Sequence, residues 1–344
     1  MAETVQKDIA SVPQNRARML FLVLGLVILT GLSALALMTG KYPLSFWDVV
    51  RLISGKDVTD PIAANVLWNI RVPRLLAGLC VGASLAAAGA AYQGIFRNPL
   101  VSPDILGVSA GASLGAVLGI FLSLPIMAIQ FFSFAGGLMA VALVYAAGTA
   151  IRNRDPVLVL VLVGMAVGAL IGAAISLIKM LADPYDQLPA ITYWLLGSLT
   201  AVSLDDLQAT IPAFIFGFVP LLLLRWRINL LSLGDEDAHA LGVNTKLLRP
   251  LLIASATLMT AAAVSIAGIV GWIGLVMPHI ARMLVGPDYR RLLPTAMLAG
   301  AAYLVLVDIL ARTIAAIEIP LGILTATIGA PFFIWLLASG KRGW

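Results

Sequence analysis

Long apolar runs separated by short polar segments dominate the hydropathy pattern of this chain. A helix that crosses the hydrocarbon core of a bilayer needs about 20 mainly apolar residues. By that criterion the pattern predicts about ten membrane-spanning helices, and it shows no strand-like alternation. We therefore expect an all-α integral membrane protein, with residues 1–344 forming one polytopic domain. The predicted spans are residues 19–39, 71–91, 105–123, 126–149, 157–180, 206–225, 248–267, 272–286, 294–314 and 320–338.

The polar segments between these spans differ in charge, and the difference predicts an orientation. With an even number of spans both termini lie on one side, and that side carries about twice as many Lys and Arg residues as the other. The positive-inside rule then places both termini in the cytoplasm, with residues 1–18 as a cytoplasmic tail. The apolar stretch from Met19 to Met38 is longer than the 7–15 apolar residues of a typical signal peptide. We interpret it as an uncleaved first span.

The composition excludes several other classes of protein. Hydrophobic residues make up 61% of the chain and charged residues only 11%, against about 25% charged in soluble domains. The single cysteine, Cys80, allows no internal disulfide framework. His239 and His279 lack partners at metal-ligand spacing, so we expect no metal site. The net charge of +5 could indicate nucleic acid or acidic lipid, but cytoplasmic loop charges explain it better, since no basic run exceeds two residues.

Residues 226–247 form the polar segment with the clearest local signature. Ser232 and Asp235 have the spacing of a capping box. Gly242 can end a helix in the left-handed conformation, and Asn244 can cap the helix that follows. The pattern thus predicts two short helices joined by a sharp turn on the cytoplasmic side. Such a turn can be either an amphipathic helix lying on the bilayer or a rigid element that docks into a partner, and composition does not decide between them.

Three arginines lie at predicted external ends of spans, where positive charge is disfavoured. They are Arg71 and Arg74 before the second span and Arg312 at the end of the ninth. Arginines near helix ends commonly reach toward lipid phosphates. Alternatively, their planar guanidinium groups could form bidentate salt bridges with carboxylates of a docked protein. Asp308 precedes Arg312 by one helical turn and could pair with it.

Other features bear on how transport would be powered. Glycine and proline interrupt residues 98–111, 271–279 and 320–331; most such positions serve packing, although broken helices line pathways in transporters. Few acids or histidines fall within spans, which disfavours a proton-driven secondary transporter. A membrane enzyme is also disfavoured, because we interpret the pair Asp205-Asp206 as the polar start of the sixth span. The chain has no Walker A motif, so ATP would bind a separate subunit.

The order and spacing of several motifs resemble the FecCD family, the permease subunits of ABC importers for ferric siderophores, haem and cobalamin. The resemblance extends from the first motif to the C-terminus. The motifs are RVPRLLAGLCVGASLAAAGAAYQGIFRNPLVSPDILGVSAGA (71–112), YWLLGSL (193–199), LGDEDAHALGVN (233–244), IAGIVGWIGLVMPHIAR (266–282), DILART (308–313) and EIPLGILTATIGAPFFIWLL (318–337).

This resemblance implies a homodimer in the bacterial inner membrane, with ten spans per subunit and the translocation path at the dimer interface. It implies two ABC ATPase subunits that bind ATP and Mg²⁺ on the cytoplasmic side, a periplasmic binding protein opposite, and no enzymatic activity or cofactor in this chain. Three groups of residues match family sites. They are a coupling loop at Asp235, Glu236, Ala240, Leu241, Gly242, Val243 and Asn244, docking arginines at Arg71, Arg74 and Arg312, and a cytoplasmic gate at Asn98, Leu100, Val157 and Leu158.

The cargo is the least determined part of this interpretation. Ferric siderophore is the commonest cargo of the family and is our expectation, with haem, cobalamin or an oxyanion such as molybdate as alternatives. The external segment KMLADPYDQL (179–188) would help to shape the outer cavity, but it carries no chemistry that selects one cargo.

Overall fold

The computed structural model describes residues 14–55, 60–151 and 156–338, and these residues form helices and loops without a strand. Most of the predicted N-terminal tail lies outside the described residues. The long helices are α2 (Gln14–Met38), α5 (Val72–Ile95), α6 (Val108–Phe121), α7 (Ile126–Ala150), α8 (Pro156–Leu181), α10 (Leu204–Leu231), α12 (Thr245–Ala267), α13 (Ile273–Val285), α14 (Tyr289–Thr313) and α15 (Leu321–Ala338). The short helices are α3 (Phe46–Ile53), α4 (Pro61–Asn65), the π-helical turn η1 (Val66–Arg71), the 3₁₀ turn η2 (Pro103–Leu106), α9 (Gln187–Leu196) and α11 (Asp235–Ala240).

The all-helical prediction is confirmed for the described residues, and every predicted span overlaps one of the long helices. Six helical segments are long and apolar enough to cross a bilayer, namely 61–95, 126–150, 157–181, 204–231, 245–267 and 289–313. Four shorter apolar helices, at 23–38, 108–121, 273–285 and 321–336, overlap the remaining predicted spans. The number of membrane crossings stays a prediction, since length and composition alone identify only the first six.

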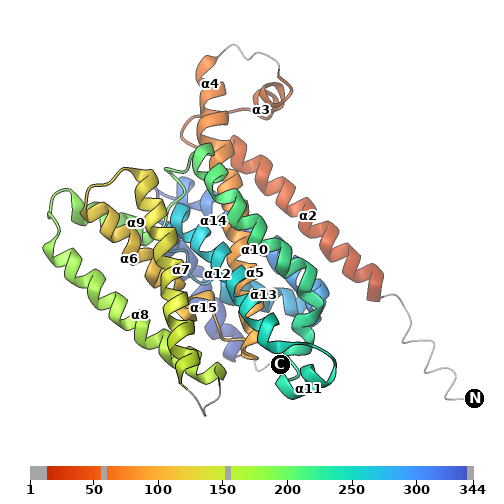
Figure 1. The fold of residues 1–344 in the computed structure, drawn as a ribbon. Helices are drawn as coiled ribbons and strands as arrows, with labels where there is room; N and C mark the ends of the chain where they lie inside the picture. Colours follow the sequence, from red (N-terminus) through yellow and green to blue (C-terminus); the bar gives the residue numbers. More distant parts are fainter. Residues whose placement is uncertain (1–13, 56–59, 152–155, 339–344) are drawn as a thin grey trace, which may run out of the picture.

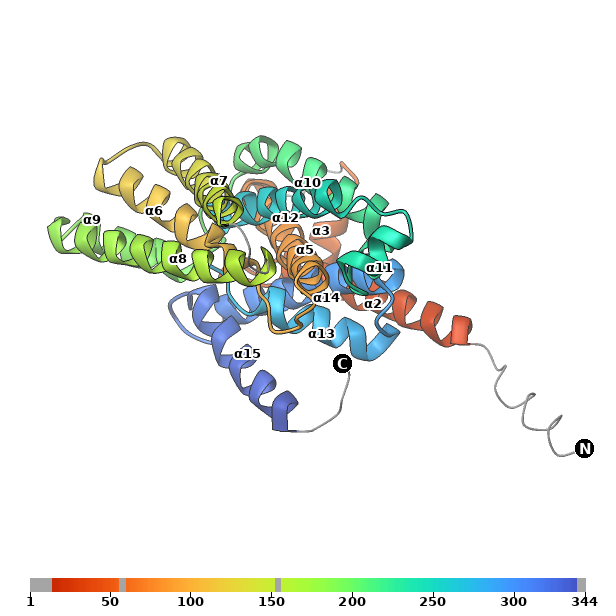
Figure 2. The ribbon, with the colours of Figure 1, turned by 60° about the horizontal axis from the view of Figure 1, so that its bottom comes forward.

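Helix α5 lies at the centre of the bundle, and the other helices surround it (Figures 1 and 2). It contacts α10, α12, α13 and α14, while α6, α7 and α8 pack together on one side and α2 packs against α14 on the other. The central helices are the more buried ones. In the most apolar part of each helix, the buried share is 72% for segment 61–95 and 78% for α12, but only 22% for α7 and for α8. The peripheral helices therefore present apolar side chains outward, as lipid contact requires.

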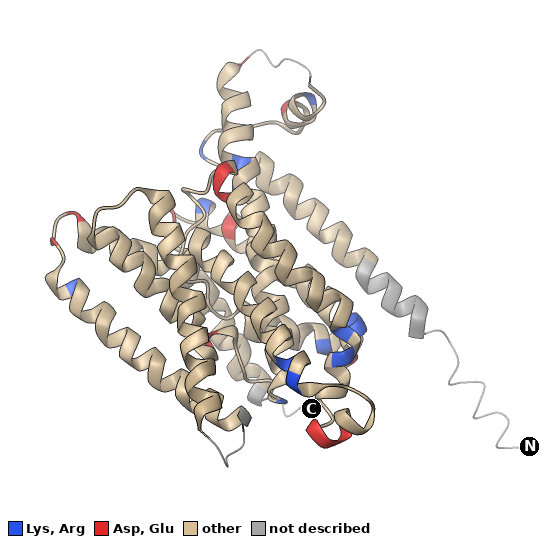
Figure 3. Ribbon diagram, viewed as in Figure 1, with Lys and Arg blue, Asp and Glu red and all other residues tan. Residues whose placement is uncertain are grey.

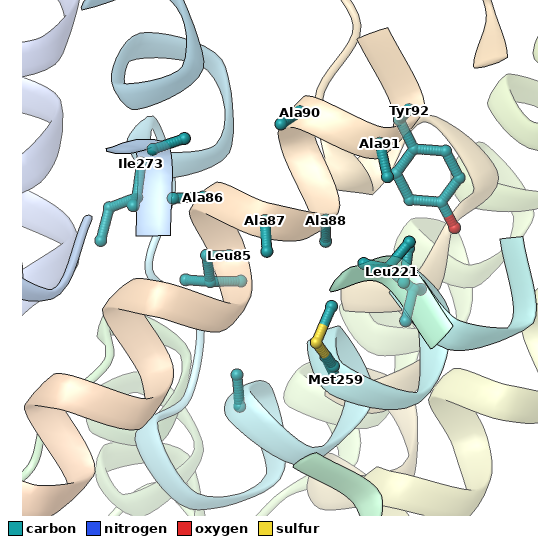
Figure 4. Packing of buried hydrophobic residues seen from close by; sticks show 14 of the residues in the cluster. Leu85, Ala86, Ala87, Ala88, Ala90, Ala91, Tyr92, Leu221, Met259 and Ile273 are labelled. Atoms are coloured by element: carbon teal, nitrogen blue, oxygen red, sulfur yellow. The ribbon is translucent and has the colours of Figure 1, made fainter. Parts of the chain in front are cut away.

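Small residues allow the neighbours of α5 to approach its backbone closely. Ala86, Ala87 and Ala88 are fully buried, and Figure 4 shows this run beside side chains from α10, α12 and α13. A Cβ atom added to Gly89 would lie 1.8 Å from the carbonyl oxygen of Gly274 on α13. Between lipid-solvated helices such close contact supplies the packing energy, because lipid tails solvate large apolar side chains equally well.

The end of the bundle that is predicted to be external contains helical structure that hydropathy did not predict. The predicted second span begins inside a continuous helical stretch from Pro61 to Ile95, so Arg71 lies within a helix and not at its mouth. The predicted polar connection before it contains α3, which is only eight residues long and therefore too short for a hydropathy signal. Ser45 and Asp48 form a capping box at its start. Helix α9, ten residues long, was missed for the same reason.

Three chain breaks meet where α9 and α12 end and α15 begins. The N–H of Ser198 donates to the carbonyl of Ala267 over 2.8 Å, and the N–H of Leu321 donates to that of Gly197 over 2.9 Å. Gly197 and Gly268 both have positive φ, which allows the two helices to end sharply at this point. These bonds satisfy backbone groups that the interrupted helices leave free, as an apolar environment demands. We call these contacts the helix-break junction.

The contact between Gly89 and Gly274 predicts a large effect of a single methyl group. The change Gly89→Ala should destabilise the purified protein by about 3 kcal/mol or prevent its accumulation, because the obstructing atoms belong to backbone and cannot rotate away. Gly31→Ala is the matched control, since a Cβ there meets nothing within 4 Å. Thermal unfolding and size-exclusion yield in detergent measure both. Equal stability of the two variants would contradict the packing account.

Candidate functional site

The predicted coupling segment forms a short helix and a tight turn at one end of the bundle. Helix α10 continues to Leu231, so the segment without long helices is residues 232–244, shorter than predicted. Gly242 has φ of +81°, and the side chain of Asn244 accepts from the N–H of Leu247, so both of these predictions are confirmed. The capping box at Ser232 is wrong. Its hydroxyl donates to the carbonyl of Asn229, and Gly234 occupies the N-cap without a side-chain bond.

An ion pair ties this short helix to the start of α12. Arg249 donates to both carboxylate oxygens of Asp235, over 2.6 and 3.1 Å. Bidentate geometry of this kind fixes orientation as well as distance. Glu236 and Leu241 are exposed, whereas Ala238 is fully buried and anchors the helix. The helix-turn unit is therefore held in place from within and presents its acidic and apolar surface outward.

A hollow of about 400 Å³ brings part of the predicted gate next to the coupling segment. Arg97, Val157 and Arg249 line it together with residues 233–237. Leu100 and Leu158 are 48% and 55% exposed. The side chain of Asn98 accepts from the N–H of Leu100 over 2.9 Å and so holds the turn after α5. Two predicted sites that are far apart in sequence thus share one end of the bundle.

Sequence reasoning missed Arg97 and Arg249 as members of this group. Their position was the signal, since Arg97 closely follows α5 and Arg249 lies near the start of α12, on the side that carries the coupling segment. The pairing of Arg249 with Asp235 could have been inferred from opposite charges at the two ends of one turn, but only the fold shows that Arg97 reaches the same hollow.

Of the three predicted docking arginines, Arg71 and Arg74 are buried and Arg312 is partly buried, and all three engage partners inside the chain. Arg74 lies 2.7 Å from Asp308 and 3.0 Å from Glu318 in ion pairs, and Arg312 lies 3.3 Å from Asp308, which confirms the predicted pairing within α14. Arg71 donates to the carbonyl of Leu37 over 2.6 Å, and it is only 4% exposed. We call Arg71, Arg74, Arg312, Asp308 and Glu318 the external charge cluster.

The external charge cluster joins separate elements of the fold. Arg312 donates to the carbonyl groups of Ala36 and Thr39 at the end of α2. Glu318 accepts from the hydroxyl of Thr200 over 2.6 Å, two residues beyond Ser198 in the helix-break junction. Removing one partner of a buried ion pair typically costs about 3–5 kcal/mol, because the other charge stays buried. Docking to another protein through these arginines would therefore compete with internal contacts.

The residues above the bundle, around α3 and α4, carry their own polar contact. The hydroxyl of Tyr42 donates to the carboxylate of Asp60, and this hydrogen bond lowers the pKa of Asp60 and raises that of Tyr42. Asp60 also caps α4 through the N–H of Ile62. The contact therefore joins the segment after α2 to the start of α4.

Charged residues gather at the two ends of the bundle and leave its middle apolar (Figure 3). Several Lys and Arg residues lie at the end that carries α11, and the described start of α2 and end of α15 point toward the same end. Within the described residues, no group of three or more His, Cys, Asp or Glu side chains could hold a metal ion.

Comparison with known proteins places the whole chain in one family. The profile of the FecCD transport family matches residues 26–339. A molybdate import system permease protein of Haemophilus influenzae is 39% identical over 96% of this chain and 98% of its own length. An iron chelatin transport system permease protein of Helicobacter pylori is 44% identical over 79% and 82% of the two chains.

A solved structure extends the match to three dimensions. A metal-chelate type ABC transporter in an inward-facing conformation superposes with a TM-score of 0.83 at 39% identity, covering 92% of this chain and 97% of that one. Sequence and fold agree over nearly the full length. This chain therefore belongs to the FecCD transport family, the membrane permease subunits of ABC importers for metal chelates.

Proposed function

We propose that this chain forms the translocation path of a binding-protein-dependent importer in the bacterial inner membrane. Two copies, each with ten spans and cytoplasmic termini, would combine with two ATPase subunits and a periplasmic binding protein. The observation that carries the proposal is the anchored helix-turn of residues 235–244. It borders the 400 Å³ hollow that Val157 of the predicted gate also lines, so a movement of the helix-turn would act on Val157 directly. Residues 1–344 form the translocation path, and the partner ATPase subunits bind ATP and Mg²⁺.

The outward faces of α8 and α15 support contact with a second copy. Leu170 and Met180 on α8 and Ile334 on α15 are 72%, 85% and 67% exposed. Gly168 and Gly172 of α8 have open space around them, so another helix could approach their backbone closely. A path between two such faces would be bounded by apolar side chains and would need no ligand atoms from this chain.

For the cargo, we propose a ferric siderophore, with haem, cobalamin or molybdate as alternatives. The relatives support a metal chelate or oxyanion but differ among themselves, since one is named for molybdate and another for iron chelatin. Selectivity would reside in the binding protein. Purifying that protein and measuring which chelate it retains decides the cargo without any assumption about the path.

We further propose that the external charge cluster meets carboxylates of the docked binding protein. Glu318 forms the ion pair with Arg74 that such a carboxylate would form, and it also accepts a hydrogen bond from the hydroxyl of Thr200. A partner's carboxylate that displaced Glu318 would free Thr200 and loosen the helix-break junction behind it. Docking on one face could thereby bias the outer end of the path.

The conformation of Gly242 predicts how coupling can be broken. Gly242→Val should leave ATP hydrolysis by the complex but reduce uptake at least tenfold, because a β-branched residue disfavours φ of +81° and the turn would rearrange. ATPase activity and uptake in proteoliposomes measure the two. Gly55→Val is the control, since Gly55 has φ of +70° and equally open surroundings near the external end. Normal coupling in Gly242→Val would refute the docking role.

The position of Glu318 predicts an unusual gain of affinity. Reversing Arg71, Arg74 and Arg312 to Glu should weaken docking, but their burial means that it should also disturb the fold. Glu318→Gln instead removes the internal competitor, so the binding protein should dock about fivefold more tightly, most clearly at low salt.

Asp186→Asn removes one charge from an exposed external position and serves as the control for Glu318→Gln. Surface plasmon resonance on the purified complex at two ionic strengths measures both variants. Unchanged or weaker docking of Glu318→Gln would leave the cluster with a purely internal, structural role.

A further inference from the structure

A second hollow opens at the end of the bundle that carries α11, between α10 and α14. Its volume is about 560 Å³, and Leu222, Leu223, Arg225, Trp226 and Arg290 line it. It shares no lining residue with the hollow beside the coupling segment. None of the predicted family sites includes these residues, so the role of this α10–α14 hollow is open.

The walls of the α10–α14 hollow are fixed by hydrogen bonds between the two helices. The side chain of Asn229 donates to Asp288 over 2.8 Å and accepts from the N–H of Tyr289 over 2.9 Å. Ile228 is fully buried beneath them. Arg225 lies one turn before Asn229, and Arg290 directly follows Tyr289, so both arginines extend from a base that these bonds fix.

The charge around the α10–α14 hollow is net positive, although the Asp288 carboxylate attracts Arg290 and Arg291. Among the described residues, neither Arg225 nor Arg290 forms an ion pair. Arg227 adds a third positive group, 5.4 Å above the ring of Trp226. Asp288 is the nearest acid in sequence, and its carboxylate is already engaged by Asn229 and by the N–H of Arg290. Two guanidinium groups thus face a space that an anion would fill.

The same hollow is apolar on the side toward the middle of the bundle. Leu223 is 70% exposed and Trp226 is 41% exposed, and both continue the outer surface of α10. With 28 residues, α10 is about 42 Å long, whereas the hydrocarbon core measures about 30 Å. Helix α10 is thus longer than the hydrocarbon core, and Trp226 lies in its Arg-containing end, as is typical of tryptophan at the headgroup level.

We infer that the α10–α14 hollow binds the phosphate headgroup of an anionic phospholipid. Arg225 and Arg290 take the phosphate oxygens, Trp226 lies at the headgroup level, and Leu222 and Leu223 contact the first part of an acyl chain. Basic pockets between membrane helices bind anionic lipids by this combination of charge and apolar surface. The assignment to the cytoplasmic leaflet rests on the proposed function, because that proposal sets the orientation.

A lipid at this position would brace α10 against α14 from outside. The coupling segment directly follows α10, and α14 carries Asp308 and Arg312 of the external charge cluster at its other end. The bound lipid would thus hold the two helices that connect the cytoplasmic turn with the external face, and anionic lipid would support coupling as well as stability.

Native mass spectrometry of the full-length permease tests the inference without ATP or cargo. Purified protein is titrated with phosphatidylglycerol, or with phosphatidylcholine of the same chains. The Arg225→Gln/Arg290→Gln variant should bind phosphatidylglycerol about thirtyfold more weakly, with phosphatidylcholine unaffected. Arg51→Gln/Lys179→Gln removes the same charge toward the external end and should bind like the wild type. The conservative Arg225→Lys/Arg290→Lys variant should stay within a few-fold of the wild type and shows that charge is what matters.

Three results would overturn the inference. The first is equal phosphatidylglycerol binding by the Gln variant and the wild type, and the second is an equal loss in the external control. The third is displacement of the lipid by a competitor. Displacement by millimolar inorganic phosphate would indicate a site for free anions, and displacement by the purified ATPase subunit would indicate a protein contact. Failure of transport in the wild-type complex would instead reject the proposed function and leave the lipid titration unchanged.

Discussion

Close backbone contact around α5 is the constraint on which the remaining structure depends. Gly82 and Gly300 meet where α5 crosses α14, and Gly89 and Gly274 meet where it crosses α13. In lipid, burial of large apolar side chains gives little advantage over exposure to acyl chains, so helices associate through contacts that only small residues permit. The alanine-rich run of α5 serves this purpose, and it explains why one of the two most buried helices has such small side chains.

This central packing fixes the distance between the coupling segment and the external charge cluster, while the peripheral helices make fewer contacts with the centre of the bundle. Helices α5, α12 and α14 form the inner frame. The anchored turn of residues 235–244 sits at one end of the frame, and the external charge cluster sits at the other. Helices α8 and α15 contact the frame less extensively and expose much of their apolar surface, as suits helices that would face a second copy.

The two ends of the bundle differ in how far their arginines are paired with acids. At the end predicted to be external, Arg74, Asp308 and Glu318 form ion pairs that tie separate elements together. At the other end, Asp235 pairs with Arg249, but Arg225 and Arg290 stay without an ion pair among the described residues. Buried charges must be compensated, whereas charges at a membrane surface can be compensated by lipid or by another subunit.

The sequence alone determined the class of the protein and much of its local structure. Length and apolarity of the runs located all the long helices, because backbone groups in a bilayer must bond within helices. Gly242 and Asn244 behaved as their types require, since left-handed backbone and N-capping are local properties. Ser232 did not, because the continuation of α10 to Leu231 placed its hydroxyl beside the carbonyl of Asn229 instead of beside a helix start.

Apart from the i,i+4 pair of Asp308 and Arg312, only the tertiary structure decided which charges meet. Arg74 and Glu318 are 244 residues apart, and no periodicity links them. Helix packing also buries Arg71 and Arg74, places Arg97 and Arg249 in one hollow, and places Arg225 and Arg290 in another. Hydropathy reports how each segment meets the bilayer, whereas ion pairs depend on which helices become neighbours. That choice is made by small-residue contacts whose partners lie far away in the chain.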